Sequence, residues 1–416
     1  MTTPTPAVRE RLLSLDSGEL PAYLYDMTSL REHAATVRAA LPERVELYYA
    51  AKANPEAEIL AALGPYVDGY EVSSGGELAH VAKGVPGRPL AFSGPGKTPA
   101  ELTTALELGV ERFHVESLHE LHMLAALAAR TAPWTTGRPA RPGVLLRFNL
   151  PLAAASLEGS SLAMGGRPTP FGLDPAEADT AVRLLTDGTY PQLRLLGVHA
   201  HLASGLDAPE QLAVAGSVVT WAADLATRHR VRIAEVNVGG GMSVDYAAPE
   251  RRFDWTAYGA GLGRLTGAHA DLTLRIEPGR SLTAYCGWYA TEVLDVKHSH
   301  GEEFAVVRGG THHMRTPATK GHDQPCSIVP VSEWPHPWPR PAAGTERVTL
   351  TGQLCTPKDL LSRNVAAPGL RAGDRVAFGL AGAYAWNISH HDFLMHPRPG
   401  FHFVTAEQRM RSSPGI

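Results

Sequence analysis

Residues 193–241 read LRLLGVHAHLASGLDAPEQLAVAGSVVTWAADLATRHRVRIAEVNVGGG. The run Leu193–His199 is short and apolar and is bounded by turn residues, which predicts a strand. A long helix is predicted over Pro209–His229, and a second strand over Ile233–Val238. A strand, a helix and a further strand in this order are typical of a βα unit in a parallel sheet.

The same alternation runs through the sequence on both sides of this stretch. Six further strands are predicted at Val45–Ala50, Asp68–Val72, Pro89–Ser93, Arg112–Val115, Gly143–Phe148 and Leu272–Ile276. Helices are predicted at Pro55–Leu63, Gly76–Lys83, Pro99–Leu108, Leu118–Arg130, Pro175–Thr186 and Trp255–Leu265. Eight βα units in about 230 residues favour a (β/α)8 barrel of the TIM type. An open, doubly wound sheet is the competing interpretation, because alternation alone does not show closure.

Beyond Ile276 the pattern becomes β-rich, with turn residues between short runs and little helix. Strands are predicted there at Tyr285–Lys297, Glu303–Arg308, Arg347–Thr351 and Arg375–Leu380. We therefore expect two domains, a barrel over residues 31–277 and a C-terminal β domain over residues 278–416. Residues 1–30 are expected to form an N-terminal segment that pairs with the β domain.

Composition narrows the class of protein. The 416 residues carry 38 Lys and Arg against 42 Asp and Glu, so the chain lacks the basic footprint of a nucleic-acid binder. A hydrophobic share of 44% supplies a core and excludes disorder as the main state. Three cysteines exclude a disulfide scaffold and fit a reducing compartment. Neither a membrane span of ~18 apolar residues nor a signal core is recognisable, so we expect a cytoplasmic location.

Reactive residues follow four of the predicted strands, at the end of a barrel where active sites lie. Lys52 follows the first strand and His199–Gly205 the sixth, while Gly239–Gly241 follows the seventh and Glu277–Arg280 the eighth. Taken alone, each has a structural explanation, such as a snorkelling lysine or a surface turn. Together they would bring to one rim a lysine able to form a Schiff base and a glycine backbone able to approach a phosphate.

Eight motifs occur in a fixed order along the chain: Tyr49–Pro55, Glu71–Leu78, Gly94–Lys97, His199–Gly205, Gly239–Gly241, Glu277–Arg280, Cys355–Asp359 and Gly382–Tyr384. In this order they resemble the fold-type III pyridoxal-phosphate decarboxylases, which include diaminopimelate and ornithine decarboxylases. The resemblance covers residues 22–400. It implies an alanine racemase-like barrel with a β domain, pyridoxal 5'-phosphate (PLP) as cofactor, and a homodimer that shares its active sites across the interface.

The resemblance implies a role for each matching residue. Lys52 matches the lysine that holds PLP as a Schiff base, and His201 matches the imidazole stacked on its ring. Glu277 matches the carboxylate that pairs with the pyridine nitrogen, which it would keep protonated so that the ring accepts electrons as CO2 leaves. Alanine racemases carry arginine at that position, so Glu277 favours decarboxylation. The remaining matches form the cofactor-binding and phosphate-binding set: Ser204, Gly239, Gly240, Gly241, Gly279, Arg280 and Tyr384.

Cys355 matches the family cysteine that the neighbouring subunit contributes to the active site. Its expected task is to protonate Cα after CO2 is lost, as a general acid. Cys286 and Cys326 have no such motif around them and are interpreted as inert buried thiols.

The residues after Cys355 bear on the substrate. Thr356, an uncharged hydroxyl, stands where diaminopimelate decarboxylases typically have Glu and ornithine decarboxylases have Asp, so a free diamino acid would lack the partner for its far ammonium group. The segment 309–322 instead contains Arg, Lys and His side chains, which suit substrate carboxylates. The predicted substrate-binding residues are Arg147, His312, His313, Arg315, Lys320, Thr356 and Asp359.

With Gly382–His391, this segment resembles the branch that acts in siderophore biosynthesis on an amino acid already conjugated to citrate. A citryl-diamino acid is therefore the preferred substrate. A related branch decarboxylates aminoacyl groups tethered to an acyl carrier protein, and that alternative stays open, as does a free diamino acid such as diaminopimelate. An inactive PLP-binding homologue is less favoured, because Lys52, the three glycines and Arg280 are all present, and a racemase is less favoured because of Glu277.

Two further patterns are weighed and set aside. Ala91–Thr98 satisfies the loose Walker A pattern for an ATPase, but it lies within the decarboxylase motifs. The pairs His312/His313 and His390/His391 resemble metal ligands, yet adjacent strand residues point to opposite faces, so a pair rarely supplies two ligands. We predict no metal, no nucleic-acid partner and no membrane association.

Overall fold

The structure, a computed structural model, describes residues 3–130, 141–151, 162–163 and 165–405. The chain divides into two compact units. The barrel unit contains residues 33–243 and 253–281, and the β unit contains residues 1–32, 244–252 and 282–416. Residues 244–252 were predicted to belong to the barrel but lie in the β unit. There the ring of Tyr246 contacts the ring of His322, and Arg252 lies over the ring of Tyr285.

The barrel unit is built around a closed, parallel eight-stranded barrel with the strand order β10-β11-β2-β3-β4-β5-β6-β8. Its strands are β2 (Val45–Ala50), β3 (Gly69–Val72), β4 (Leu90–Phe92), β5 (Arg112–Val115), β6 (Gly143–Arg147), β8 (Arg194–His199), β10 (Glu235–Asn237) and β11 (Thr273–Ile276). All eight predicted strands are therefore present within one or two residues at either end. Closure between β11 and β2 confirms the barrel and excludes the open, doubly wound sheet.

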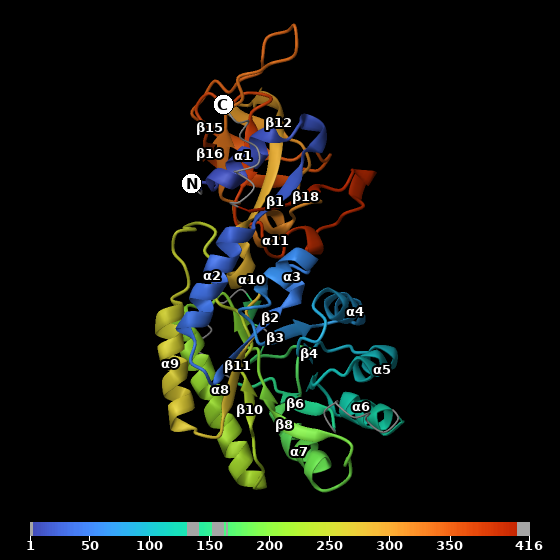
Figure 1. Cartoon of the computed structure of the whole chain (residues 1–416). Helices are drawn as coiled ribbons and strands as arrows, with labels where there is room; N and C mark the ends of the chain where they lie inside the picture. Colours follow the sequence, from blue (N-terminus) through green and yellow to red (C-terminus); the bar gives the residue numbers. More distant parts are fainter. Residues whose placement is uncertain (1–2, 131–140, 152–161, 164, 406–416) are drawn as a thin grey trace, which may run out of the picture. The chain divides into compact units, whose positions relative to one another are not determined.

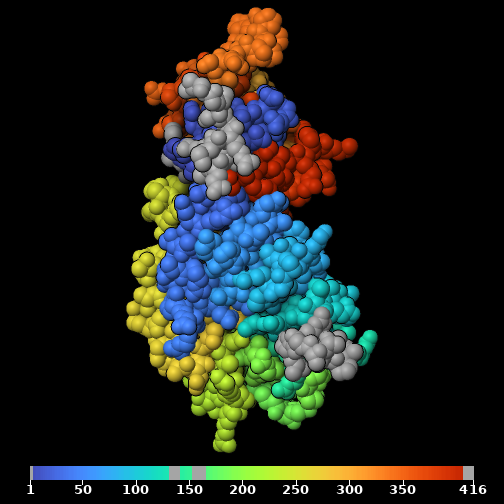
Figure 2. Space-filling model, viewed as in Figure 1, coloured from blue at the N-terminus to red at the C-terminus, as the bar shows by residue number. Residues whose placement is uncertain are grey.

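Helices lie on the outside of the barrel strands (Figure 1). They are α3 (Ala57–Leu63), α4 (Gly75–Gly84), α5 (Pro99–Leu108), α6 (Leu118–Arg130), α7 (Ala178–Thr186), α8 (Ala208–His229) and α9 (Trp255–Ala268), with α2 (Met27–Ala40) leading into the first strand. Residues of α3 to α6, coloured blue to cyan, form part of the surface shown in Figure 2. Capping boxes start two of these helices, Thr98 with Glu101 at α5 and Asp207 with Glu210 at α8. Two short strands, β7 (Leu162–Ala163) and β9 (Ala203–Ser204), form a separate antiparallel pair. In the sequence they follow barrel strands β6 and β8, respectively.

Charged side chains fill the interior of the barrel in layers. Arg275 on β11 is fully buried and pairs with Glu46 and Glu235. Arg112 on β5 reaches Glu235 on β10 at 3.0 Å, although these strands are not neighbours, so the contact crosses the lumen. Side chains two residues further along a strand point the same way. The next layer, toward the carboxyl ends of the strands, therefore contains His114, Asn237 and Glu277.

The β unit is a mixed sheet. Its strands are β1 (Ala22–Asp26), β12 (Gly287–Ser299), β13 (Glu302–Val307), β14 (Cys326–Val329), β15 (Arg347–Thr351), β16 (Leu360–Ala366), β17 (Arg375–Phe378) and β18 (Gly400–Val404). Strand β1 pairs antiparallel with β12 and parallel with β18. Helix α1 (Pro6–Ser14) buries Val8 and Leu12 in the core of this unit, and α10 (Arg280–Thr283) and α11 (Thr316–Lys320) are short.

No helix in the described part of the chain is both long enough and apolar enough to cross a membrane.

Candidate active site

Lys52 lies in a single 3-10 turn, Ala51–Ala53, at the carboxyl end of β2. Its Nζ donates to Glu71 Oε2 at 2.6 Å and to Ser73 Oγ at 3.3 Å. Glu71, from β3, is buried and also accepts hydrogen bonds from the hydroxyls of Ser73 and Ser93. Burial by itself would raise the pKa of Glu71, but the charge and hydrogen bond of Lys52 lower it to about 2. The lysine is thus held by an ionised carboxylate at the rim of the barrel.

Glu277 lies at the carboxyl end of β11 and is 8% exposed. Its Oε1 accepts a 2.6 Å hydrogen bond from Asn237 Nδ2, and the imidazoles of His114 and His199 stand 3.8 Å from its two oxygens. Burial and the nearby charge of Glu71 raise the pKa of Glu277 to about 7. Burial lowers the pKa of both histidines well below the usual range, so this carboxyl group faces neutral imidazoles at neutral pH.

The glycine loop connects this carboxyl group to His201. Gly239 N–H donates to Asn237 Oδ1 at 2.8 Å, and Gly240 N–H donates to His201 Nδ1 at 3.1 Å. These two amides therefore shape the loop and do not point freely at a ligand, which refines the expectation that all three glycines cradle a phosphate directly. Gly241 has φ of +98°, a conformation that favours glycine, and a Cβ there would overlap the Ala203 carbonyl.

His201 accepts the Gly240 N–H at Nδ1, so its neutral ring carries its proton on Nε2, where Ser204 Oγ lies 3.3 Å away. Burial, followed by the charges of Arg147 and Lys52, lowers the pKa of His201 to about 3. The His201 imidazole is therefore neutral and is held by contacts at both ring nitrogens.

These residues fit PLP. The cofactor needs an amine for its aldehyde, an acidic partner for its pyridine nitrogen and a close backbone for its phosphate. Lys52, Glu277 and the crowded loop Gly239–Gly241, where side chains have no space, supply these three features from one unit. Gly279 and Arg280 follow Glu277 and Pro278, and Arg280 is the first residue of α10.

One cluster in the described part of the chain has the spacing of a metal site. The ligand atoms of His114, His199 and Glu277 lie within 4.8 Å of one another. Asn237 Nδ2, however, lies 2.6 Å from the Glu277 carboxylate and 3.4 Å from His114 Nε2. A hydrogen-bond donor between two of the three ligands opposes a cation there, so we assign the cluster to the floor of the cofactor site.

Lys97, the lysine of the Walker-like pattern, is fully used inside the barrel unit. Its Nζ donates to Glu120 Oε1 at 2.6 Å and to the carbonyls of Gly94 and His114 at 2.7 and 2.8 Å. With its side chain 1% exposed, it has no donor left for a nucleotide phosphate. This geometry argues against the ATPase alternative.

Arg147 is also buried, at the end of β6, and donates to Glu116 Oε1 at 2.7 Å. Glu116 accepts the backbone N–H groups of Gly94 and Gly172 as well, so the ion pair ties three loops together. The charge of Arg147 acts on the site by lowering the pKa of His201. Its direct contact with a substrate stays a prediction.

The β unit contains the other predicted residues. Cys355 is exposed with a free thiol, and Thr356 is half-buried beside it. Cys286 and Cys326 are buried, and burial raises the pKa of both thiols, to about 12 for Cys326, which agrees with inert thiols.

Two residues predicted to bind substrate make structural contacts within the β unit. Asp359 is 2% exposed, and its carboxylate accepts the backbone N–H groups of Thr311 at 2.6 Å and Leu354 at 2.8 Å. His313 is buried, with its ring nitrogens 3.0 Å from the Tyr289 hydroxyl and the Pro397 carbonyl. These polar groups are used within the unit, and contact of either residue with a substrate stays a prediction.

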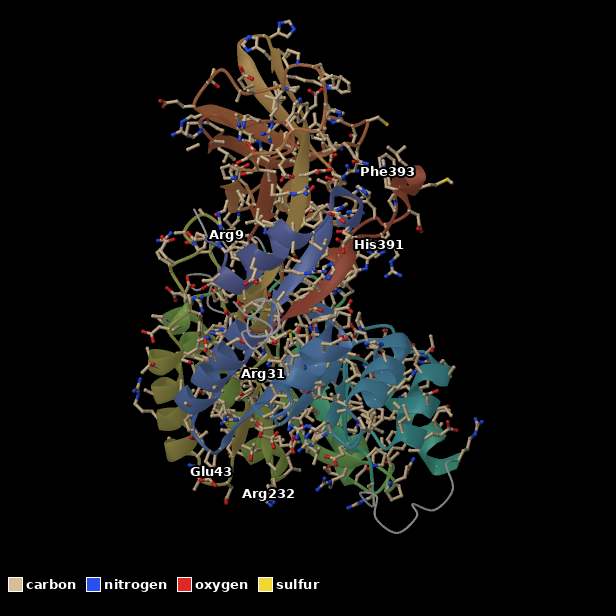
Figure 3. All side chains as sticks on the ribbon, turned by 45° about the horizontal axis from the view of Figure 1, so that its top comes forward. Arg9, Arg31, Glu43, Arg232, His391 and Phe393 are labelled. Atoms are coloured by element: carbon tan, nitrogen blue, oxygen red, sulfur yellow. The ribbon has the colours of Figure 1, made fainter. Side chains whose placement is uncertain are left out.

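The remaining predicted residues lie on two segments of the β unit. Arg315 and Lys320 are exposed at the start and end of α11, whereas His312 is buried, and burial lowers its pKa to about 4. Tyr384, at φ +48°, accepts a hydrogen bond from the Thr316 hydroxyl on its carbonyl. Figure 3 labels His391 and Phe393 further along this second segment.

Four important residues escaped the sequence argument: Glu71, His114, His199 and Asn237. Glu71 and His199 lie inside quoted motifs without an assigned role, while the other two lie outside them. Their signal was available, because each is a polar residue in a predicted buried strand. Such a residue must find a partner, and in a closed barrel the partner is on another strand.

Comparison with known proteins agrees with this geometry. The family profile "Pyridoxal-dependent decarboxylase, pyridoxal binding domain" matches residues 27–284. The 2-[(L-alanin-3-ylcarbamoyl)methyl]-2-hydroxybutanedioate decarboxylase of Staphylococcus aureus is 37% identical over 396 residues, covering 94% of this chain and 96% of that protein. The L-glutamyl-[BtrI acyl-carrier protein] decarboxylase of Niallia circulans is 30% identical, over 92% of this chain and 88% of its own.

Among solved structures, a variant of the diaminopimelate decarboxylase from Helicobacter pylori with bound L-lysine has a TM-score of 0.78. It is 25% identical and covers 91% of this chain and 90% of its own. The matches extend over both units. The chain belongs to the pyridoxal-dependent decarboxylase family.

Proposed function

We propose that this PLP-dependent decarboxylase removes the α-carboxylate of a citryl-diamino acid conjugate and leaves an amine for siderophore biosynthesis. Support comes from the relative in Staphylococcus aureus, whose name describes a hydroxybutanedioate linked through an amide to the 3-position of alanine. Such a molecule keeps one α-amino acid for the chemistry and carries additional carboxylates at its far end.

The state of Asp359 is the observation that carries the proposal. A free diamino acid presents an ammonium group at its far end, which needs an accessible acid. In the described segment 353–359 the one carboxylate belongs to Asp359, and it is buried against backbone N–H groups. Thr356 offers only a hydroxyl. This part of the β unit is therefore poorly suited to a cationic substrate end.

Exposed positive charge on the neighbouring segment supports the same substrate class. Arg315 and Lys320 are both exposed, and a guanidinium can bind a carboxylate through two parallel hydrogen bonds. His312, with a pKa of about 4, is neutral at neutral pH and would act as a hydrogen-bonding group instead of a cation. We propose these three residues as the contacts for the citryl carboxylates.

The residues of the barrel unit divide the chemistry among them. PLP, when bound, supplies the electron sink for the carbanion left when CO2 departs. Lys52 is the amine that would take its aldehyde, and Glu71 keeps that amine oriented. Glu277 is held by Asn237, where it can keep a proton on a ring nitrogen. Cys355 is the proposed proton donor to Cα of the product.

We further propose that the enzyme is a cytoplasmic homodimer in which Cys355 serves the active site of the partner subunit. Support comes from its exposure and free thiol, since a catalytic thiol needs both access and reducing conditions. A carrier-bound aminoacyl group is the second candidate substrate, because the relative in Niallia circulans acts on one.

The test is CO2 release by the PLP-loaded enzyme from substrates labelled with 13C in the α-carboxylate. The panel contains a citryl-diaminopropionate conjugate, an aminoacyl carrier protein and free diaminopimelate, and Lys52→Ala serves as the inactive control. We expect release from the citryl conjugate. Release from diaminopimelate alone would refute the substrate class, whereas Thr356→Glu is expected to shift preference toward it.

A further inference from the structure

We infer that Asn237 is a positioning residue that fixes the Glu277 carboxylate and the first glycine of the phosphate loop relative to each other through one side-chain amide. The inference deepens the proposed function and rests on it. It names a residue outside the motifs that suggested PLP in the first place.

Both ends of the Asn237 amide are used. Its Nδ2 donates to Glu277 Oε1 at 2.6 Å, and its Oδ1 accepts the Gly239 N–H at 2.8 Å. The residue is fully buried at the end of β10, so water does not replace a lost partner. Since the amide is planar, a rotation that improves one hydrogen bond breaks the other. The Asn237 amide therefore fixes the position of the Glu277 carboxylate relative to the glycine loop.

A second contact closes the connection. The backbone N–H of Glu277 donates to the Gly239 carbonyl at 2.8 Å, so the two segments are linked through side chain and main chain. The other polar neighbours of the carboxylate, His114 and His199, are 3.8 Å away, beyond hydrogen-bond distance. Among the described side chains, Asn237 is thus the residue that fixes the direction of the Glu277 carboxylate.

Gln211 provides a matched control. It lies on α8, is 2% exposed, and donates from Nε2 to the Gly240 carbonyl at 3.1 Å. Gln211 therefore supports the same glycine loop from the helix side, and its amide donates to the loop carbonyl and not to Glu277. A variant at Gln211 disturbs the loop alone, whereas a variant at Asn237 disturbs the loop together with the carboxylate.

The test is a double-mutant cycle on cofactor affinity, measured by titrating the PLP-free full-length protein with PLP and with pyridoxal, which lacks the phosphate. In the wild type, we expect Glu277→Gln to weaken PLP binding about tenfold, as loss of a charge-assisted contact does. In the Asn237→Ala background the same change should cost less than about twofold, because the carboxylate is no longer aimed.

Comparing the affinity for PLP with that for pyridoxal distinguishes the two hydrogen bonds of the Asn237 amide. Asn237→Asp keeps an oxygen for the Gly239 N–H and has no donor for Glu277 when both carboxyl groups are ionised, so this variant is titrated at alkaline pH. It should therefore retain the wild-type preference for PLP over pyridoxal while abolishing the cost of Glu277→Gln. Gln211→Leu should do the opposite, reducing the preference while leaving the full cost of Glu277→Gln.

A full tenfold cost of Glu277→Gln in both Asn237 backgrounds would overturn the inference. If Asn237→Ala fails to fold, the isosteric Asn237→Asp decides by the same criterion. Failure of the wild-type protein to bind PLP would instead overturn the proposed function, so the two failures are distinguishable.

Discussion

Replacing Glu277 by Gln should stabilise the PLP-free protein at alkaline pH, although it damages the cofactor site. Burial, and next the charge of Glu71, raise the pKa of Glu277 from its ordinary 4.5 to about 7 in the folded chain. A carboxyl whose folded pKa is raised binds its proton more tightly when folded. Its ionisation therefore costs stability as pH rises from about 4.5, and the cost is complete above about 7.

The size of the effect follows from that interval. At 1.36 kcal/mol for each pH unit, the difference between 4.5 and 7 amounts to about 3 kcal/mol. Gln keeps an oxygen for the Asn237 donor but carries no charge, so it escapes this cost. We expect Glu277→Gln and wild type to unfold alike at pH 4.5, and the variant to be more stable by about 3 kcal/mol at pH 8.

Urea unfolding of both PLP-free proteins at the two pH values measures this difference. Glu43→Gln is a suitable control, since Glu43 is exposed and the substitution should leave the pH dependence unchanged. A stability difference that does not change with pH, or a variant that is less stable at pH 8, would refute the reasoning that Glu277 is a desolvated carboxyl.

Three further outcomes are expected. Mixing Lys52→Ala with Cys355→Ala protein should restore about a quarter of wild-type turnover by random subunit exchange, because half of the dimers then hold one intact site of two; no recovery after verified exchange would exclude a shared site. Gly241→Ala should weaken PLP binding by about tenfold or more, because alanine is strained at φ +98°, whereas Gly216→Ala, in a helix, should leave the affinity unchanged. Equal affinities of the two variants in a PLP titration would contradict the claim that the loop has no space for a side chain. Lys97→Met should destabilise folding by about 3–5 kcal/mol in chemical unfolding, since it leaves a buried carboxylate unpaired, and a loss below about 1 kcal/mol would show that pair to be unimportant.

The barrel was predictable because each of its elements repeats one local pattern. The observed β2 and β5 coincide with the predicted Val45–Ala50 and Arg112–Val115, as α6 does with Leu118–Arg130. Apolar periodicity and strong caps, such as the box at Thr98, are properties of neighbouring residues and are legible in the sequence.

Strands that depend on distant partners were missed. β14 and β18 are short, β16 includes the polar run Ser362–Asn364, and the stability of all three comes from pairing. β18 is an example, because Ala22 lies opposite Gly400 in a register that no local pattern specifies.

The site shows the same division. Lys52, Glu277 and the glycine triplet were predicted because each follows a strand, and the structure places each of them just after a barrel strand. Asn237 was missed because its contact with Glu277 appears only once β10 pairs with β11. Asp359 was predicted to bind substrate. The sequence does not show that its carboxylate accepts two backbone N–H groups, because those contacts form only in the folded loop. Sequence position therefore predicted which candidate groups lie at the strand ends, but the hydrogen bonds that orient them required the structure.

The central claim is that Lys52 is the residue that carries PLP, at the rim of the barrel unit. Borohydride reduction of the PLP-loaded enzyme, followed by peptide mapping with mass spectrometry, tests it directly. We predict one phosphopyridoxyl adduct, located on Lys52, and its loss in Lys52→Ala. An adduct on another lysine, or none in a protein that still releases CO2, would contradict the account.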